Sequence, residues 1–311
     1  MQLEPMETEA VDDSVQQLNA LGIQELRRAL RPGSDAAICL KKAIQYFELS
    51  LQRIADQPPL YFNIGLANQT LADLSLSEAA LDFARQAADQ ARIYLDLRAN
   101  DSSGSELLLT ALKSIARLST NRQEQIDMYR QAISLAEPRL VIERRSYEQF
   151  HLCTQLGLLH GECGLICDQD RRLEYFVRAA SMFRTALDFD PDDLMVRYNY
   201  ANALMDSGKH ATDADDRKKA FTESQRIHEQ AIASLNGNSE ADRRAVAKRN
   251  FSETSLRYNY ACLLALHEQP ESALAVLDSL FKSGKIDRVT VEQDPDFDSL
   301  RELPEYQALM A

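Results

Sequence analysis

Apolar and small side chains recur along this chain with the spacing of one face of an α-helix. Ala179, Phe183 and Ala186 stand at positions i, i+4 and i+7, which share a helix face. Long stretches are dominated by Ala, Leu, Gln, Glu and Arg, and these residues lose little side-chain freedom in a helix. Only 10 Gly and 9 Pro interrupt the 311 residues. The pattern therefore predicts helix throughout.

Turn-forming clusters divide this pattern into separate helices. The segments Asn236–Ser239 and Asp101–Gly104 are the strongest of these breaks. The predicted helices cover residues 11–31, 35–56, 60–74, 76–98, 105–118, 121–135, 140–166, 171–188, 193–208, 214–235, 241–249, 252–267, 270–283 and 297–309. No linker is long enough to require independent domains.

An internal repeat is visible in the second half of the chain. The pentapeptide Arg197–Ala201 recurs unchanged as Arg257–Ala261. Tyr61–Gly65 is a weaker copy, and Thr154–Gly157 keeps the order of a bulky apolar residue followed by a small one. A bulky residue beside Gly or Ala lets one helix fill a hole while the partner backbone approaches closely. The repeat therefore indicates paired, stacked helices.

These units resemble tetratricopeptide repeats, whose pattern is W-x2-L-G-x2-Y, then A-x3-F, then P. Val196–Leu204 is similar to the first helix of that pattern, with Arg197 where Trp is usual, and Asp294–Tyr306 resembles a closing segment of the family. The resemblance implies an all-α fold, a right-handed array of antiparallel helix pairs (an α-solenoid). We expect an N-terminal segment over 1–33, divergent repeats over 34–137, and tetratricopeptide-like repeats with a C-terminal capping helix over 138–311.

The spacing of the units departs from the family's period of 34 residues. Gly157 and Ala201 are 44 residues apart, and Ala201 and Ala261 are 60 apart. Longer helices or inserted loops would explain this, and we place candidate insertions at 167–170, 207–216 and 236–249. An irregular array is expected.

The charge and the cysteine content of the chain limit the ligands and the compartment that can be expected. The net charge of −13 disfavours nucleic acid and anionic membranes, because both bind through Lys and Arg. The N-terminus has neither the basic start nor the apolar run of a secretory signal, and no stretch reaches the length of a membrane span. An odd number of cysteines, five, indicates reduced thiols. A cytoplasmic protein is expected.

Two groups of side chains could hold a metal, and a purely structural role is preferred for both. Cys153, His160, Cys163 and Cys167 share one face of a predicted helix, but a straight helix spreads them over about 21 Å at 1.5 Å per residue, so core packing is favoured over zinc. A second set matches some positions of a calcium loop but lacks its Gly, so helix capping is favoured; it comprises Asp294, Asp296, Asp298 and Glu305. No metal or cofactor is expected.

Catalytic motifs are absent from the sequence, so the hypothesis is a non-enzymatic scaffold or adaptor. His151, His210, His228 and His267 are expected at the solvated surface. In the family the first helices of the units line a groove that binds a peptide. Transferring this logic gives the candidate partner-binding residues Phe62, Asn63, Tyr198, Asn199, Asn202, Tyr258 and Asn259. Packing roles remain an equal alternative for these side chains.

The acidic composition favours a neutral or basic partner segment. Two other classes of protein stay open at this point: a regulatory sensor that changes shape on binding a small ligand, peptide or metal, and an enzyme whose site is assembled from dispersed residues.

Overall fold

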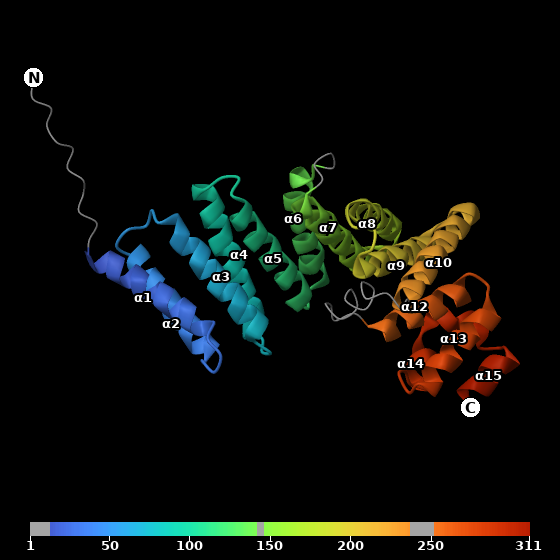
Figure 1. Cartoon of the computed structure of the whole chain (residues 1–311). Coiled ribbons are helices and arrows are strands. Elements are labelled where there is room, and N and C mark those ends of the chain that lie inside the picture. Colours follow the sequence, from blue (N-terminus) through green and yellow to red (C-terminus); the bar gives the residue numbers. More distant parts are fainter. Residues whose placement is uncertain (1–12, 142–145, 237–251) are drawn as a thin grey trace, which may run out of the picture. The chain divides into compact units, whose positions relative to one another are not determined.

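A computed structural model of the chain describes residues 13–141, 146–236 and 252–311 (Figure 1). All regular structure in these three ranges is helical, which confirms the predicted all-α class. The chain divides into two compact units, one ending at Leu135 and the other beginning at Ala136.

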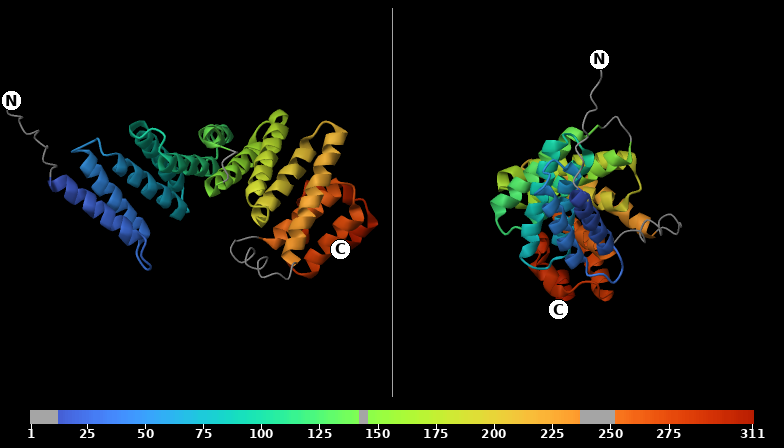
Figure 2. Two further views of the ribbon diagram at one scale, coloured as in Figure 1. Left: turned by 45° about the horizontal axis from the view of Figure 1, so that its top comes forward. Right: turned by 90° about the vertical axis from the view of Figure 1, so that its left-hand side faces the viewer.

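The first unit consists of six helices. They are α1 (Asp13–Ala29), α2 (Ala36–Leu51), α3 (Pro58–Leu74), α4 (Ala79–Leu97), α5 (Ser102–Leu118) and α6 (Arg122–Ala136). From α1 to α5 each helix packs against the next one along the chain, as the views of this unit in Figure 2 show. Side-chain caps set two of the starts: Asp35 accepts a hydrogen bond from the backbone N–H of Ile38, and Asp101 accepts one from Gly104.

The second unit contains the longer helices and the C-terminal cap. Its elements are the 3₁₀ turn η1 (Glu137–Arg139), α7 (Tyr147–Ile166), α8 (Gln169–Phe189), α9 (Leu194–His210), α10 (Ala214–Asn236), α12 (Glu253–Leu266), α13 (Pro270–Lys282), α14 (Arg288–Gln293), the 3₁₀ turn η2 (Pro295–Leu300) and α15 (Pro304–Met310). Helix α7 packs on α8, α9 on α10, and α12 on both α13 and η2.

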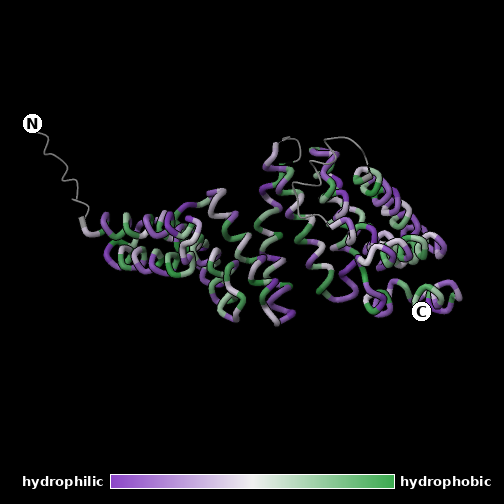
Figure 3. The backbone as a smooth tube through the Cα atoms, turned by 60° about the horizontal axis from the view of Figure 1, so that its bottom comes forward, coloured by the Kyte–Doolittle hydropathy of each residue, from purple (hydrophilic) through white to green (hydrophobic). Residues whose placement is uncertain are grey.

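The contacts within each pair confirm that bulky side chains fit against small ones. A Cβ atom at Gly157 of α7 would lie 2.6 Å from the ring of Phe183 on α8, and one at Gly208 of α9 would lie 2.5 Å from the ring of Phe221 on α10. Apolar and polar positions alternate around these helices (Figure 3), and the apolar face of each is turned into the core. The chain is an array of helix pairs, as predicted.

Three details of the prediction were wrong. The expected insertions at 167–170 and 207–216 do not exist, since α8 begins at Gln169 and α10 at Ala214. The other expected explanation, longer helices, is confirmed, with 21 residues in α8 and 23 in α10. The single helix expected over 297–309 is broken at Pro304 into η2 and α15, and α14 was not predicted. The predicted helix 241–249 and most of the insertion at 236–249 lie outside the described residues.

Candidate functional site

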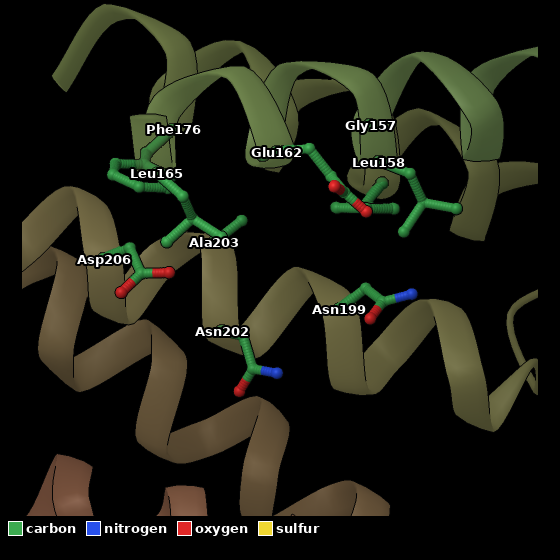
Figure 4. Close-up of a pocket in the computed structure, with 11 residues that line it drawn as sticks. Gly157, Leu158, Glu162, Leu165, Phe176, Asn199, Asn202, Ala203 and Asp206 are labelled. Atoms are coloured by element: carbon green, nitrogen blue, oxygen red, sulfur yellow. The ribbon is translucent and has the colours of Figure 1, made fainter. Parts of the chain in front are cut away.

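A hollow of about 210 Å³ lies between α7 and α9 in the second unit (Figure 4). Helix α9 contributes Asn199, Asn202 and Asp206, which stand at i, i+3 and i+7 and therefore share one face. Asp193 fixes the start of this helix, because its carboxylate accepts a hydrogen bond from the backbone N–H of Val196 at 2.9 Å. The wall is thus a continuous polar stripe on a rigid element.

The opposite wall is formed by α7 and is mixed in character. Leu158, Glu162 and Leu165 point toward the hollow, and Leu165 is 62% exposed. Gly161 lies among them, and a Cβ atom added there would meet nothing within 4 Å. The floor is aromatic, with rings from α8. The hollow therefore offers apolar surface beside acidic groups.

Every ionisable side chain that lines the hollow is acidic. Burial, with a contribution from Asp296, raises the pKa of Asp206 to about 6, while Lys209 acts in the opposite direction. The ammonium of Lys209 lies 2.6 Å from a carboxylate oxygen of Asp296, so much of its charge is already paired. The negative charge at Asp206 is only partly compensated within the protein.

A hydrogen-bonded triad joins α9 to α12 and contains three of the predicted site residues. The amide nitrogen of Asn259 donates to the hydroxyl oxygen of Tyr198 at 2.9 Å and to the amide oxygen of Asn202 at 3.0 Å. Burial raises the pKa of Tyr198, so its hydroxyl stays protonated. The Tyr198 ring packs beside the buried Leu256. This triad fixes α9, the first helix of its pair, against α12, the first helix of the next pair.

Tyr258 makes a different set of contacts. Its hydroxyl donates to a carboxylate oxygen of Asp294 at 2.6 Å, and its ring meets Phe297 edge to face at 5.8 Å between centroids. Burial and the bond to Asp294 raise the pKa of Tyr258. Its polar tip is therefore committed to the C-terminal elements.

Asn199 is the predicted residue that faces the hollow without a hydrogen-bond partner among the described residues. It occupies the same place in the repeat as Asn259. The positions in α7 that correspond to Tyr198 and Asn202 are Thr154 and Leu158, and the hydroxyl of Thr154 donates to the backbone carbonyl of Phe150. The amide of Asn199 therefore lacks the acceptors that Asn259 finds.

The remaining two predicted residues belong to the first unit. Phe62 of α3 packs its ring against Tyr94 of α4, with centroids 5.4 Å apart. Asn63 is half-buried beside it. Phe62 is therefore placed by packing between α3 and α4.

The cysteine and histidine stripe on α7 is buried. Cys153 and Phe183 belong to one core cluster, and burial raises the pKa of the Cys153 thiol to about 11. His160 lies with its Nε2 3.5 Å from a carboxylate oxygen of Glu137, and burial lowers its pKa to about 4. The four side chains of the stripe do not converge into a ligand group among the described residues.

A different group of potential ligands does converge, at the contact of α12 with η2. One ligand atom from each of Cys262, Asp294 and Asp296 lies within 4.8 Å of the other two. Tyr258 and Lys209 already bind the two carboxylates, and the thiol of Cys262 donates to Asp294 at 3.7 Å. Asp294 also caps η2, as the capping interpretation predicted. These contacts join the group into a hydrogen-bonded network.

Sequence reasoning missed the acidic part of the hollow and misplaced one histidine. Glu162 and Asp206 hold equivalent positions 44 residues apart, the same spacing as Gly157 and Ala201, so the repeat could have paired them. His228 was expected at the surface and is completely buried, with its Nδ1 3.0 Å from the backbone carbonyl of Ser224. Its polar neighbours in sequence lie on the other faces of α10, and they misled the prediction.

Comparisons with known proteins give only distant structural matches. No family model matches the sequence, and no curated protein matches it. Among solved structures, the nuclear import adaptor Nro1 of S. pombe matches with 13% identity over 93% of this chain and 98% of its own, at a TM-score of 0.47. MamA from Desulfovibrio magneticus matches with 18% identity over 71% of this chain and 98% of its own (TM-score 0.40).

A thermophilic tetratricopeptide protein, TTC0263 of Thermus thermophilus, matches with 16% identity over 81% of this chain and 100% of its own (TM-score 0.35). Within the described ranges, every helix is too short or too polar to span a lipid bilayer. The repeated pentapeptide, the small-to-bulky contacts within pairs and the consecutive pairing of helices make this chain a tetratricopeptide-like helical-repeat protein.

Proposed function

We propose that the chain is a non-enzymatic scaffold or adaptor that binds a segment of a partner polypeptide along the first helices of its second unit. The proposal depends on the position of Asn199 in the hollow. This residue lines the hollow, whereas the amide nitrogen of its repeat equivalent Asn259 donates two hydrogen bonds within the protein. A side-chain amide can bond a peptide backbone through both its donor and its acceptor.

The chemistry of the described nucleophiles supports binding over catalysis. The five cysteine thiols are all buried, and thiolate formation is disfavoured where burial raises the pKa, as at Cys153. The hydroxyl of Ser224 lies 3.4 Å from Nδ1 of His228, but both residues are sealed from solvent at 0% exposure. A substrate has no access to this pair.

The acidic lining favours a neutral or basic segment. Glu162 and Asp206 face the hollow, and no Lys or Arg lines it among the described residues. Complementary charge raises the association rate and disfavours acidic competitors. Nucleic acid would be repelled by the same groups, and the net charge of −13 adds to that repulsion.

A selection with site-specific crosslinking tests the proposal. Peptides that bind the full chain are first selected from a random displayed library. The photoreactive residue p-benzoylphenylalanine is then placed at Asn199 or Leu165 in the hollow, and at Arg184, an exposed position on α8, as the matched control. We expect selected peptides to crosslink at the first two positions and not at the third. Equal crosslinking at Arg184, or no enriched peptide, would refute the proposal.

A further inference from the structure

We propose that the hollow between α7 and α9 is a subsite for one Arg or Lys side chain of the bound segment, and that Asp206 selects this side chain. The inference rests on the proposed function and adds to it the position, the chemical group and the residue that recognises it.

The size of the hollow fits a side chain better than a small-molecule cofactor. Its volume is about 210 Å³, whereas sites for drug-sized ligands and cofactors span about 300–1,000 Å³. The polypeptide that carries the side chain would run along the first helices outside the hollow. Only one residue of the segment would enter.

The lining matches the two parts of a long basic side chain. Leu158 and Leu165 offer apolar surface to its aliphatic stem, and basic side chains bury such stems readily. Glu162 from α7 and Asp206 from α9 face the hollow from opposite walls (Figure 4). The amide oxygen of Asn199 adds a neutral acceptor. A guanidinium or ammonium group would meet acceptors from both helices.

The charges behind Asp206 leave it in need of a cation. Lys209 on α9 is paired with Asp296 of η2, the other ionisable side chain that lines the hollow is Glu162, and the α8 residues that line it are apolar. Asp206 and Asp296 thus share the ammonium group of Lys209. On the α12 side, Cys262 keeps its proton, because burial and Asp294 raise its pKa. A partner cation would supply the missing positive charge.

Proton linkage follows from this arrangement. The pKa of Asp206 is raised to about 6 by burial and Asp296, and a cation in the hollow would lower it. The free protein then holds more protons than the complex near pH 6, so binding releases protons and affinity rises with pH. An ammonium or guanidinium group does not itself titrate in this range.

The experiment compares one selected peptide that contains Arg with its citrulline counterpart, which keeps the shape and removes the charge. Fluorescence anisotropy with the full chain gives both affinities at about pH 5 and about pH 7.5. We expect citrulline to weaken binding about tenfold or more at the higher pH, as for charge pairs that lose one partner. Asp206→Asn should abolish this discrimination and flatten the pH dependence. Asp170→Asn, which removes an exposed carboxylate of α8, should preserve both.

A second variant tests the location without weakening the fold. Gly161→Met places a long side chain in the hollow at a helical position where its Cβ meets nothing within 4 Å. It should fold as the wild type by circular dichroism and lose most of the affinity for the Arg peptide. Equal binding of the Arg and citrulline peptides, unchanged discrimination in Asp206→Asn, or unchanged binding in Gly161→Met would overturn the subsite. Peptide crosslinking at Asn199 would then still support the wider proposal, and its absence would refute that proposal instead.

Discussion

Two glycines one turn apart on α7 allow a strict test of how the helix pairs are built. At Gly157 a Cβ atom would lie between 2.6 and 2.8 Å from three ring atoms of Phe183, whereas at Gly161 it would meet no atom within 4 Å. Phe183 is buried at 3% exposure, so its ring has little room to move. Replacing each glycine by alanine therefore makes the same chemical change in two different environments.

The expected free energies of unfolding differ in sign. Alanine in a helix interior gains about 0.5–1 kcal/mol over glycine, and Gly161→Ala should show this gain. Gly157→Ala has the same gain, but forcing a methyl group into a packed core costs about 1–3 kcal/mol. We therefore expect a net loss of roughly 1–2 kcal/mol for Gly157→Ala and a difference between the two variants of about 2 kcal/mol.

Hydrogen exchange followed by mass spectrometry on the full chain measures this locally, because peptides from α7 and α8 report the opening free energy of that pair. Urea denaturation followed by circular dichroism gives a second value from the midpoint at constant slope. If Gly157→Ala stabilised the α7–α8 pair as much as Gly161→Ala does, the close approach of α7 to Phe183 would be refuted. The small-to-bulky basis of the repeat would fall with it.

Three further predictions concern stability and reactivity. Asn259→Ala should destabilise the chain by about 1–3 kcal/mol, since two hydrogen-bond partners lose their donor, while Asn199→Ala should stay within about 0.5 kcal/mol in urea denaturation. Acidification from about pH 6.5 to 4 should lower the free energy of unfolding by up to about 3 kcal/mol for each of the buried His160 and His228, because these side chains take up protons only in the unfolded chain. His160→Gln should remove the contribution of His160 to this loss. An unchanged dependence of the unfolding free energy on pH in that variant would contradict the prediction. A thiol reagent should label almost none of the five buried cysteines in native protein and all five in denaturant, and rapid native labelling would show that the helix pairs open.

Most of the fold could be predicted because it depends on local information. Helix periodicity, the break that begins at Asp101, and the small residue beside a bulky one all act within one helix or one pair. The resemblance to tetratricopeptide repeats added the order of the pairs. Broken elements such as η2 and α15 were missed because a short helix is decided by its packing partners more than by its own sequence.

The candidate site could be predicted only in part. The repeat brought attention to Asn199, Asn202 and Asn259, and the structure places all three along α9 and α12. It did not show which amide finds a partner, since that depends on the residues of the preceding first helix. Burial of a titratable group was equally invisible, as His228 shows, because sequence neighbours on a helix point to different faces.

Successive residues of α9 serve three different neighbours, and this explains why the hollow exists. Arg197, where the family usually has Trp, donates to the hydroxyl of Ser234 on α10 and to Asp192, and so ties α9 to its own pair. Tyr198, rotated by about 100° around the helix, bonds forward to α12.

Asn199, one further step around, faces back toward α7. In α12 the same step brings Asn259 onto the acceptors of α9, but α7 presents Leu158 and Gly161 to Asn199. The pentapeptide is the same in α9 and α12, but the first helix that precedes it, α7 or α9, differs in sequence. Between the described first helices of the second unit, the polar contact of the repeat is therefore made where α9 meets α12 and is missing where α7 meets α9.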